Sequence, residues 1–135
     1  MSSKPRVYRD IEIEGTKSLS DLAEAIIGAF DFAFDHAFGF YSNLKNPYER
    51  SGERYELFAD MEGTDSDAGS VERTKVAQVF SAIGKKMLFL FDYGDEWLFQ
   101  VELVAVGGKA AKMRYPRLVA TKGDAPEQYP NEDDD

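Results

Sequence analysis

The sequence has no cysteine and only one histidine, His36, among its 135 residues. The lack of cysteine excludes a disulfide framework, thiolate metal ligands and a cysteine nucleophile. The lone histidine excludes any site that needs two imidazoles. Long apolar runs are also missing, because the longest, 87–91, is far shorter than the ~20 residues of a membrane-spanning helix. The first residues lack the apolar stretch of a signal peptide, so we expect a cytoplasmic protein without a membrane segment.

Positive charge is scarce as well. The chain holds 25 acidic against 16 basic residues, for a formal net charge of −9, which argues against a general nucleic-acid binder. Apolar residues make up 43% of the chain, enough for one domain with its own core. Residues 124–135 hold six acids and no base. We therefore expect one folded domain over 1–123, followed by an acidic and partly disordered tail over 124–135.

Apolar residues recur at helical spacing in two stretches, 18–30 and 71–83. Ser18 or Ser20 can cap the first, and acids in its first turns suit the positive end of the helix dipole. Gly84, a residue typical of helix ends, follows the second. Both stretches are predicted to be helices that present an apolar stripe to the core.

Other stretches have the composition of strands. Residues 7–13 and 97–103 alternate between apolar and polar, whereas 87–91 are apolar throughout, as in a central strand covered on both faces. Less regular strands are predicted at 36–41, with one face of phenylalanines turned inward, and at 55–60 and 117–121. The fold class is therefore α+β: a single domain with a mainly antiparallel sheet and two helices packed on one face.

The turn at 92–95 joins two of these strands into a hairpin over 87–104, which we place at the centre of the sheet. Gly94 is expected to have a positive φ in this loop. Asp92 and Asp95 are expected to accept hydrogen bonds from backbone N–H groups of the turn, with Trp97 packed beneath them.

The same turn is the densest cluster of polar and aromatic residues, and with the lone histidine it supplies the candidate functional residues: His36, Asp92, Tyr93, Asp95, Glu96 and Trp97. Its three carboxylates could bind Mg²⁺ or Ca²⁺, or act as an acid–base pair. The alternative is an ordinary hairpin turn, which we favour because the spacing does not match the Asp-x-Asp-x-Asp-Gly calcium loop. No cofactor-binding residue is identified, and catalytic and metal roles stay open.

His36 follows Asp35 inside an aromatic stretch. An imidazole can ligate a metal or act as a base, and a neighbouring carboxylate can orient it. Adjacent residues of a strand point to opposite faces, however, so we do not expect Asp35 to touch His36. A structural or surface role is the favoured interpretation.

Bases gather in the stretch 109–122, and residues 103–123 hold five of them without an acid: Lys109, Lys112, Arg114, Arg117 and Lys122. The stretch could contact phosphate or an acidic partner, or it could pair with acids of the same chain, which is the interpretation we favour. Gly107-Gly108 lacks the sequence context of a phosphate-binding loop and is predicted to be a turn.

Three separated segments resemble the root-inducing plasmid ORF-3-like family. Residues 91–97 read Phe-Asp-Tyr-Gly-Asp-Glu-Trp and resemble its signature Tyr-Asp-Phe-Gly-Asp-x-Trp. Residues 35–40 resemble its Asp-His-Leu-x-x-Phe segment, and residues 123–130 resemble its closing Gly-x-Ala-Pro-Glu-Gln-Tyr-Pro. Three matches in the right order are more specific than any one of them.

The resemblance implies a single α+β domain and says little about activity. Many members carry a second histidine near His36 and cysteines near Pro116, and this chain has neither. A metal role built on those groups therefore does not transfer. Members are also described as transposon passenger proteins with a resolvase-like label. We interpret that label as genomic association, because the chain offers no recombinase nucleophile in a basic setting.

Three functions follow as hypotheses, and the sequence does not decide whether the protein is an enzyme. The first, which we favour, is a small binding or interaction module for an unknown ligand or protein partner, because no complete catalytic set is present. The second is a metal- or carboxylate-dependent enzyme centred on the turn 92–97 and His36. The third is a nucleic-acid-associated accessory protein of mobile elements that uses the stretch 109–122. The second requires that His36 and the turn lie together.

Overall fold

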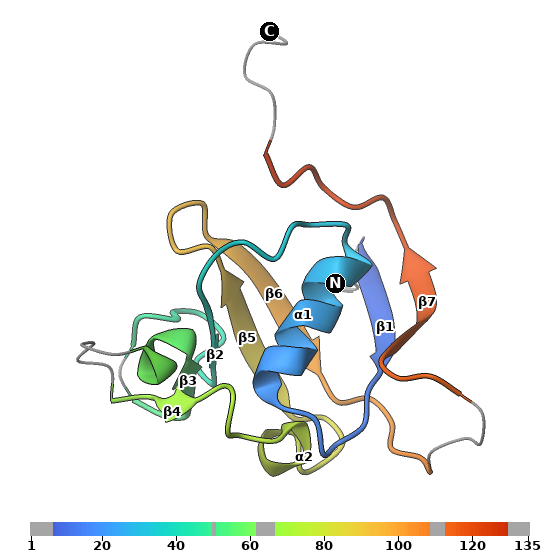
Figure 1. Ribbon diagram of the computed structural model, residues 1–135, viewed down its shortest axis with the longest axis horizontal. Helices are drawn as coiled ribbons and strands as arrows, with labels where there is room; N and C mark the ends of the chain where they lie inside the picture. Colours follow the sequence, from blue (N-terminus) through green and yellow to red (C-terminus); the bar gives the residue numbers. More distant parts are fainter. Residues whose placement is uncertain (1–6, 50, 62–66, 109–112, 130–135) are drawn as a thin grey trace, which may run out of the picture.

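The computed structural model describes residues 7–49, 51–61, 67–108 and 113–129. They form a single α+β domain with a five-stranded sheet of order β4-β3-β2-β5-β6 and a two-stranded sheet of β1 and β7 (Figure 1). All pairings are antiparallel except that of β3 with β4, so the predicted fold class is confirmed. The elements in chain order are β1 (Tyr8–Glu12), α1 (Leu19–Ala29), β2 (Phe38–Tyr41), β3 (Arg54–Glu56), the 3-10 helix η1 (Leu57–Asp60), β4 (Gly69–Ser70), α2 (Val76–Val79), β5 (Lys86–Phe91), β6 (Trp97–Glu102) and β7 (Arg117–Lys122).

Helix α1 confirms the prediction for 18–30. Ser18 is its N-cap: the Ser18 hydroxyl accepts a hydrogen bond from the Asp21 N–H at 3.0 Å, and the Asp21 carboxylate accepts one from the Ser18 N–H at 3.2 Å. This reciprocal pair satisfies two N–H groups that the first turn leaves unbonded. The apolar stripe of the helix is buried against the sheet.

The helix predicted over 71–83 is wrong in extent, because only Val76–Val79 is helical. The backbone of this region bonds to the start of α1 instead of to itself. The Leu19 N–H donates to the Thr74 carbonyl at 2.9 Å and the Ser20 N–H to the Val71 carbonyl at 3.0 Å. These long-range bonds replace the helical ladder, while Val71, Val76 and Val79 still reach the core.

The core lies between α1 and the inner faces of β2 and β5. Its largest side chains, Phe38, Phe40, Phe89 and Phe91, are fully buried, which confirms the inward phenylalanine face of β2. Leu88 and Leu90 are buried on the opposite face of β5, so β5 is covered on both sides as predicted. Within the described ranges, neither helix has the length and apolarity needed to cross a bilayer.

The β5–β6 hairpin exists but is not at the centre of the sheet, because β2 is the middle strand and β6 is an edge. The expected positive φ of Gly94 is also wrong. The left-handed residues of the turn are Asp92, with φ of 68°, and Glu96, with φ of 54°. Aspartate tolerates this conformation when its side chain bonds the local backbone, and the Asp92 carboxylate does so. The predicted strand 55–60 is strand only through Glu56, after which η1 begins.

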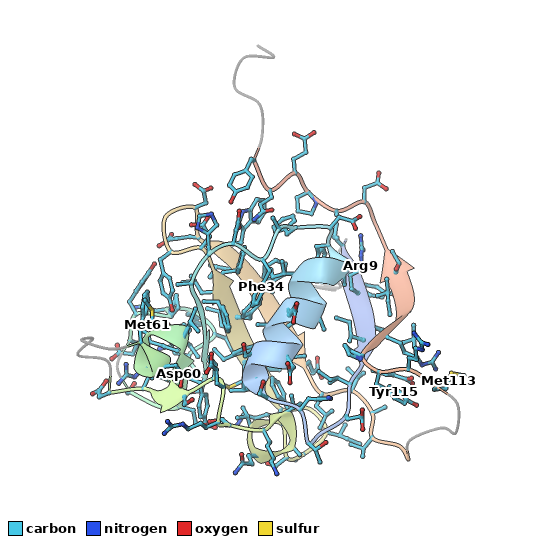
Figure 2. All side chains as sticks on the ribbon, in the orientation of Figure 1. Arg9, Phe34, Asp60, Met61, Met113 and Tyr115 are labelled. Carbon is cyan, nitrogen blue, oxygen red and sulfur yellow. The ribbon has the colours of Figure 1, made fainter. Side chains whose placement is uncertain are left out.

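Arg9 joins α1 to the smaller sheet (Figure 2). Its Nε donates to the carbonyl of Ala29 at 3.1 Å and its Nη1 to the carbonyl of Lys122 at 3.1 Å. The guanidinium also lies 4.8 Å from the centre of the Phe30 ring. Arg9 thereby satisfies a free carbonyl at the C-terminal end of α1 and fixes the end of β7 beside it.

Candidate functional site

Three segments meet at one end of the molecule, at the top of Figure 1: residues 31–37 after α1, the turn 92–96 between β5 and β6, and residues 123–129 after β7. We call these residues together the acidic end, and residues 123–129 the C-terminal strap. The three segments that resemble the ORF-3-like family overlap these same regions. Segments that are distant in the sequence are thus neighbours in space.

The path of residues 31–37 is set by how α1 ends. The Phe32 N–H donates to the carbonyl of Ile27 and the Asp31 N–H to the carbonyl of Gly28, both at 3.0 Å. Asp31 has a φ of 60°, the left-handed conformation that closes a helix in this way. The chain then crosses the end of the sheet. The Ala37 carbonyl accepts a hydrogen bond from the Asp92 N–H at 2.9 Å, and β2 begins at the next residue.

The C-terminal strap is fixed to this crossing by Gln128. The Gln128 Oε1 accepts a hydrogen bond from the Ala33 N–H at 2.7 Å, and its Nε2 donates to the Ala33 carbonyl at 3.1 Å. The Nε2 also lies 3.3 Å from Oδ1 of Asp35. One side-chain amide thus pairs with a backbone amide much as a neighbouring strand would. Residues 124–129 of the predicted tail therefore belong to the described fold, whereas 130–135 lie outside the described residues.

His36 is at the middle of the acidic end. Its Nε2 lies 2.5 Å from the Tyr129 hydroxyl, 3.4 Å from Oδ2 of Asp92 and 3.6 Å from Oδ1 of Asp35. The Tyr129 hydroxyl donates to Oδ2 of Asp35 at 3.0 Å. In that arrangement the Nε2–H of His36 is the donor to the phenol oxygen. The expectation that Asp35 and His36 do not touch is wrong, because both precede β2 and the alternation of strand residues does not apply to them.

Asp92 is held from the opposite side. Its Oδ1 accepts hydrogen bonds from the N–H groups of Gly94 at 3.1 Å and Asp95 at 3.2 Å, while Oδ2 faces His36. The residue is only 6% exposed. The predicted role of Asp92 as an acceptor in the turn is therefore confirmed. Asp95 contributes its backbone N–H, and its side chain is exposed to solvent.

Tyr93 points away from His36, to the face of the sheet opposite the core cluster. Its hydroxyl lies 2.5 Å from that of Tyr41, which in turn donates to Glu56 at 2.6 Å. Burial raises the pKa of both phenols above the ordinary value, and the bond to Glu56 adds to the rise for Tyr41. A Cβ on Gly39 would lie 2.6–2.7 Å from the two hydroxyl oxygens, so only glycine leaves room for this pair.

The last two candidates also have separate surroundings. Glu96 accepts a hydrogen bond from the hydroxyl of Tyr48, and this bond is the main cause that raises the pKa of Tyr48. Trp97 contacts Phe32 edge to face, with ring centres 4.9 Å apart. Its indole N–H is buried and has no hydrogen-bond partner among the residues that the structure describes. Of the six predicted residues, His36 and Asp92 meet through their side chains and Asp95 reaches Asp92 with its backbone N–H, whereas Tyr93, Glu96 and Trp97 have other neighbours.

Sequence reasoning missed Gln128 and Tyr129, the two strap residues that reach His36 and its neighbours. Their signal lies in the closing segment of the family resemblance, whereas composition alone places both residues in the acidic tail over 124–135. Loss of hydration and the hydrogen bond to Asp35 raise the pKa of Tyr129 to about 12, and the charges of Asp92 and Asp95 contribute. The Tyr129 phenol is therefore neutral at physiological pH and acts as a hydrogen-bond donor.

Charge of one sign dominates this end. The acidic end contains no lysine or arginine and seven carboxylates: Asp31, Asp35, Asp92, Asp95, Glu96, Asp124 and Glu127. Among the residues that the structure describes, no group of three or more His, Cys, Asp or Glu side chains is arranged to hold a metal ion. Two hollows of about 300 and 230 Å³ lie elsewhere, along α1 beside residues 115–118.

The basic stretch 109–122 has a different setting. Arg117 pairs with Glu12 across the two-stranded sheet, with 2.5 Å between Nε and Oε1. At least one of its bases is therefore compensated by an acid of the same chain, in line with the favoured interpretation. Residues 109–112 lie outside the described residues.

Comparison with known proteins supports the fold and the family. A crystal structure of a protein of unknown function from Methanosarcina mazei Go1 is similar, with a TM-score of 0.70 and 22% identity over 93% of this chain. The chain spans 66% of the length of that protein, and the likeness at this identity concerns the fold alone. None of the curated proteins matches. The sequence matches the plasmid pRiA4b ORF-3-like protein family over residues 1–132, as its three segments predicted, and the chain therefore belongs to that family.

Proposed function

We propose that the protein is a small binding module and that its acidic end binds a positively charged segment of a partner protein. One observation carries the proposal: three separate segments bring seven carboxylates, and no lysine or arginine, to one end of the fold. A surface with charge of one sign concentrates ligands of the opposite sign and speeds their association. Like charges that gather in this way also repel one another until a cation neutralises them.

The surroundings of the carboxylates support a partner that spans the surface. Asp92 is buried and already accepts two backbone hydrogen bonds, whereas Asp31, Asp35, Asp95 and Glu127 are exposed. The exposed groups come from all three segments, so no single small cation would satisfy them together. A chain with several spaced bases could.

The test is a binding titration with a fluorescent Gly/Ser peptide that carries evenly spaced lysines and arginines, followed by anisotropy. We expect binding that weakens as salt is raised, because exposed ion pairs are screened. The triple variant Asp31→Asn, Asp95→Asn, Glu127→Gln should weaken binding by about tenfold, from three exposed ion pairs of about 0.5 kcal/mol each. None of these side chains takes part in the His36 network.

A matched variant separates a local surface from the net charge of the protein. Asp10→Asn, Glu24→Gln, Glu102→Gln removes the same number of charges from exposed positions outside the acidic end. This variant should bind the peptide nearly as well as the unmodified protein. Equal loss in the two triple variants, or no binding at low salt, would contradict the proposal.

A second candidate is an acid–base or metal-assisted site at His36. It is favoured by one observation, the position of the His36 Nε2 within 3.4–3.6 Å of two carboxylates. Thermal unfolding with Mg²⁺, Mn²⁺, Ca²⁺ and Zn²⁺ tests it. A metal-dependent rise in melting temperature that His36→Gln and Asp92→Asn each abolish would support this candidate over the first.

A further inference from the structure

Exposed aromatic rings accompany the carboxylates of the acidic end. Phe34 is 41% exposed and Tyr129 is 52% exposed, and the imidazole of His36 lies between them in the chain of ring contacts. We call these three residues the aromatic platform. Its rings are amphipathic or apolar surfaces that water solvates poorly, and such patches often mark interaction sites.

The platform rests on the core. The Phe34 ring stacks on the buried ring of Phe91 at 13° with centres 6.0 Å apart, and it also contacts Phe38 at 5.3 Å. The His36 ring meets Phe91 edge to face at 6.0 Å. Tyr129 is fixed by its hydrogen bonds to Asp35 and His36. The rings are therefore held in place before any partner arrives, which lowers the entropy cost of binding.

A carboxylate lies directly beside these rings. Asp35 is the neighbour of both Phe34 and His36 in the chain, accepts the Tyr129 hydrogen bond, and its side chain is 47% exposed. A cationic group that stacks on an exposed ring is thus close to a hydrogen-bond acceptor. A planar guanidinium can use both at once, because it stacks on rings and donates in a fork to carboxylates, whereas an ammonium is a more strongly hydrated point charge.

The chain itself shows the same chemistry nearby. The guanidinium of Arg9 lies 4.8 Å from the centre of the Phe30 ring and donates to three carbonyls, those of Tyr8, Ala29 and Lys122. Arg9 belongs to the fold and leaves Phe34 and Tyr129 exposed. The platform offers similar rings, with carboxylates in place of carbonyls.

We infer that the aromatic platform selects arginine over lysine, so that the partner of the acidic end is an arginine-bearing segment of a protein. This inference rests on the proposed function, since it specifies the cation that the acidic end binds. Phe34 and Tyr129 are the specificity-determining rings, and Asp35, which follows Phe34 in the chain and accepts the Tyr129 hydrogen bond, is the acceptor.

The test compares two Gly/Ser peptides of equal length and charge, one with arginine and the other with lysine at every basic position. The arginine peptide should bind about fivefold more tightly, the effect of one cation–π contact of about 1 kcal/mol. Phe34→Leu should reduce the affinity for the arginine peptide to that for the lysine peptide, and it should leave the affinity for the lysine peptide unchanged. Phe34→Tyr, which keeps a ring, should keep the preference. Circular dichroism and melting curves establish that each variant is folded.

The possible results separate the two proposals. If neither peptide binds, both the proposed function and this inference fail. If both bind equally and Phe34→Leu changes neither, the acidic end binds cations but the platform does not select arginine. If Phe34→Leu weakens both peptides to the same degree, the ring supports the surface without reading the cation, and the inference is overturned.

Discussion

The Nε2 of His36 lies 3.4 Å from Oδ2 of Asp92, the one charged residue that is buried among those the structure describes. The two residues belong to segments that flank adjacent strands, β2 and β5. The second oxygen of Asp92 holds the β5–β6 turn through two backbone N–H groups. A single carboxylate therefore connects the shape of the turn to the position of the histidine.

The first prediction concerns this carboxylate. Asp92→Ala should lower the free energy of unfolding by about 2–4 kcal/mol, because it leaves two N–H groups unbonded and places alanine at a positive φ. Asp92→Asn keeps an acceptor oxygen and tolerates that φ, so its effect should be below ~1 kcal/mol. Urea unfolding measures both. Asp95→Ala, at the exposed neighbouring acid, is the control, and a loss there as large as in Asp92→Ala would contradict the assigned role.

Substitutions at two glycines test the backbone conformation described for the β5–β6 turn. Gly94 does not have a positive φ, and a Cβ there would be 3.4 Å from Oδ1 of Asp92, an ordinary contact. We expect Gly94→Ala to change stability by no more than ~0.5 kcal/mol. Gly84 has a φ of 97° in open space, so Gly84→Ala should cost about 1 kcal/mol from strain alone. Denaturant titrations that rank the two variants in reverse would refute this description of the turn.

A third prediction concerns the tyrosine pair over β2. Gly39→Ala should destabilise the protein by about 1–3 kcal/mol, because the added methyl meets the hydroxyls of Tyr41 and Tyr93 well inside normal contact distance. Gly28→Ala is the matched control, since apart from the local helix backbone no atom of the described residues lies within 4 Å of a Cβ at this position. It should stabilise the protein by about 0.5–1 kcal/mol. Equal effects of the two substitutions on the melting temperature would contradict the packing over Gly39.

The raised pKa values of the tyrosines predict a loss of stability in alkali. The folded-state pKa values of Tyr41, Tyr93 and Tyr129 lie above the ordinary phenol pKa near 10, and that of Tyr129 is about 12. These phenols therefore bind their protons more tightly in the folded state than in the unfolded state. Their contribution is therefore complete below pH ~10 and is lost as the pH rises through the folded-state pKa values. Tyrosinate absorbance against pH should show late-titrating groups, one fewer in Tyr129→Phe. If the absorbance that this variant lacks belongs instead to the ordinary titration near pH ~10, the hydrogen bond from Tyr129 to Asp35 is excluded.

The strap contact can be measured separately. Gln128→Ala removes both hydrogen bonds to the backbone of Ala33, so the Ala33 amide should exchange with deuterium faster. Glu127→Ala, at an exposed neighbour, should leave that exchange unchanged. Unaltered protection of Ala33 in Gln128→Ala would mean that the strap is not held in this way.

Local patterns predicted the elements whose hydrogen bonds are local or lie in a short hairpin. Helix α1 carries its own cap at Ser18, and β5 and β6 alternate or remain apolar as their burial requires. The stretch 71–83 has helical spacing too, but its backbone bonds to residues 15–20. The spacing of apolar residues predicts which side chains are buried. It does not predict whether the backbone groups bond within the same segment or to a distant one.

The candidate site was only partly predictable for the same reason. His36 and Asp92 stand out in the sequence because the histidine is unique and the turn is densely charged. That they meet depends on the pairing of β2 with β5, and the approach of Tyr129 depends on the antiparallel pairing of β1 with β7. Residue preference alone predicts a positive φ at Gly94. In the structure Asp92 has the positive φ instead, because its side chain accepts hydrogen bonds from the backbone of the turn.

The attachment of β7 by Arg9 has a consequence for how the strap competes with other ligands. Arg9 holds the carbonyl of Lys122 and Gln128 holds Ala33, so the strap is tethered at both ends. When the hydrogen bonds between Gln128 and Ala33 break, at most about 20 Å of extended chain separates Gln128 from the fixed point at Lys122. Because this linking segment is short, the effective concentration of Gln128 at Ala33 is in the millimolar range. A separate molecule that competes for the backbone of Ala33 must therefore be far more concentrated than its intrinsic affinity suggests, or must grip more than one place at a time.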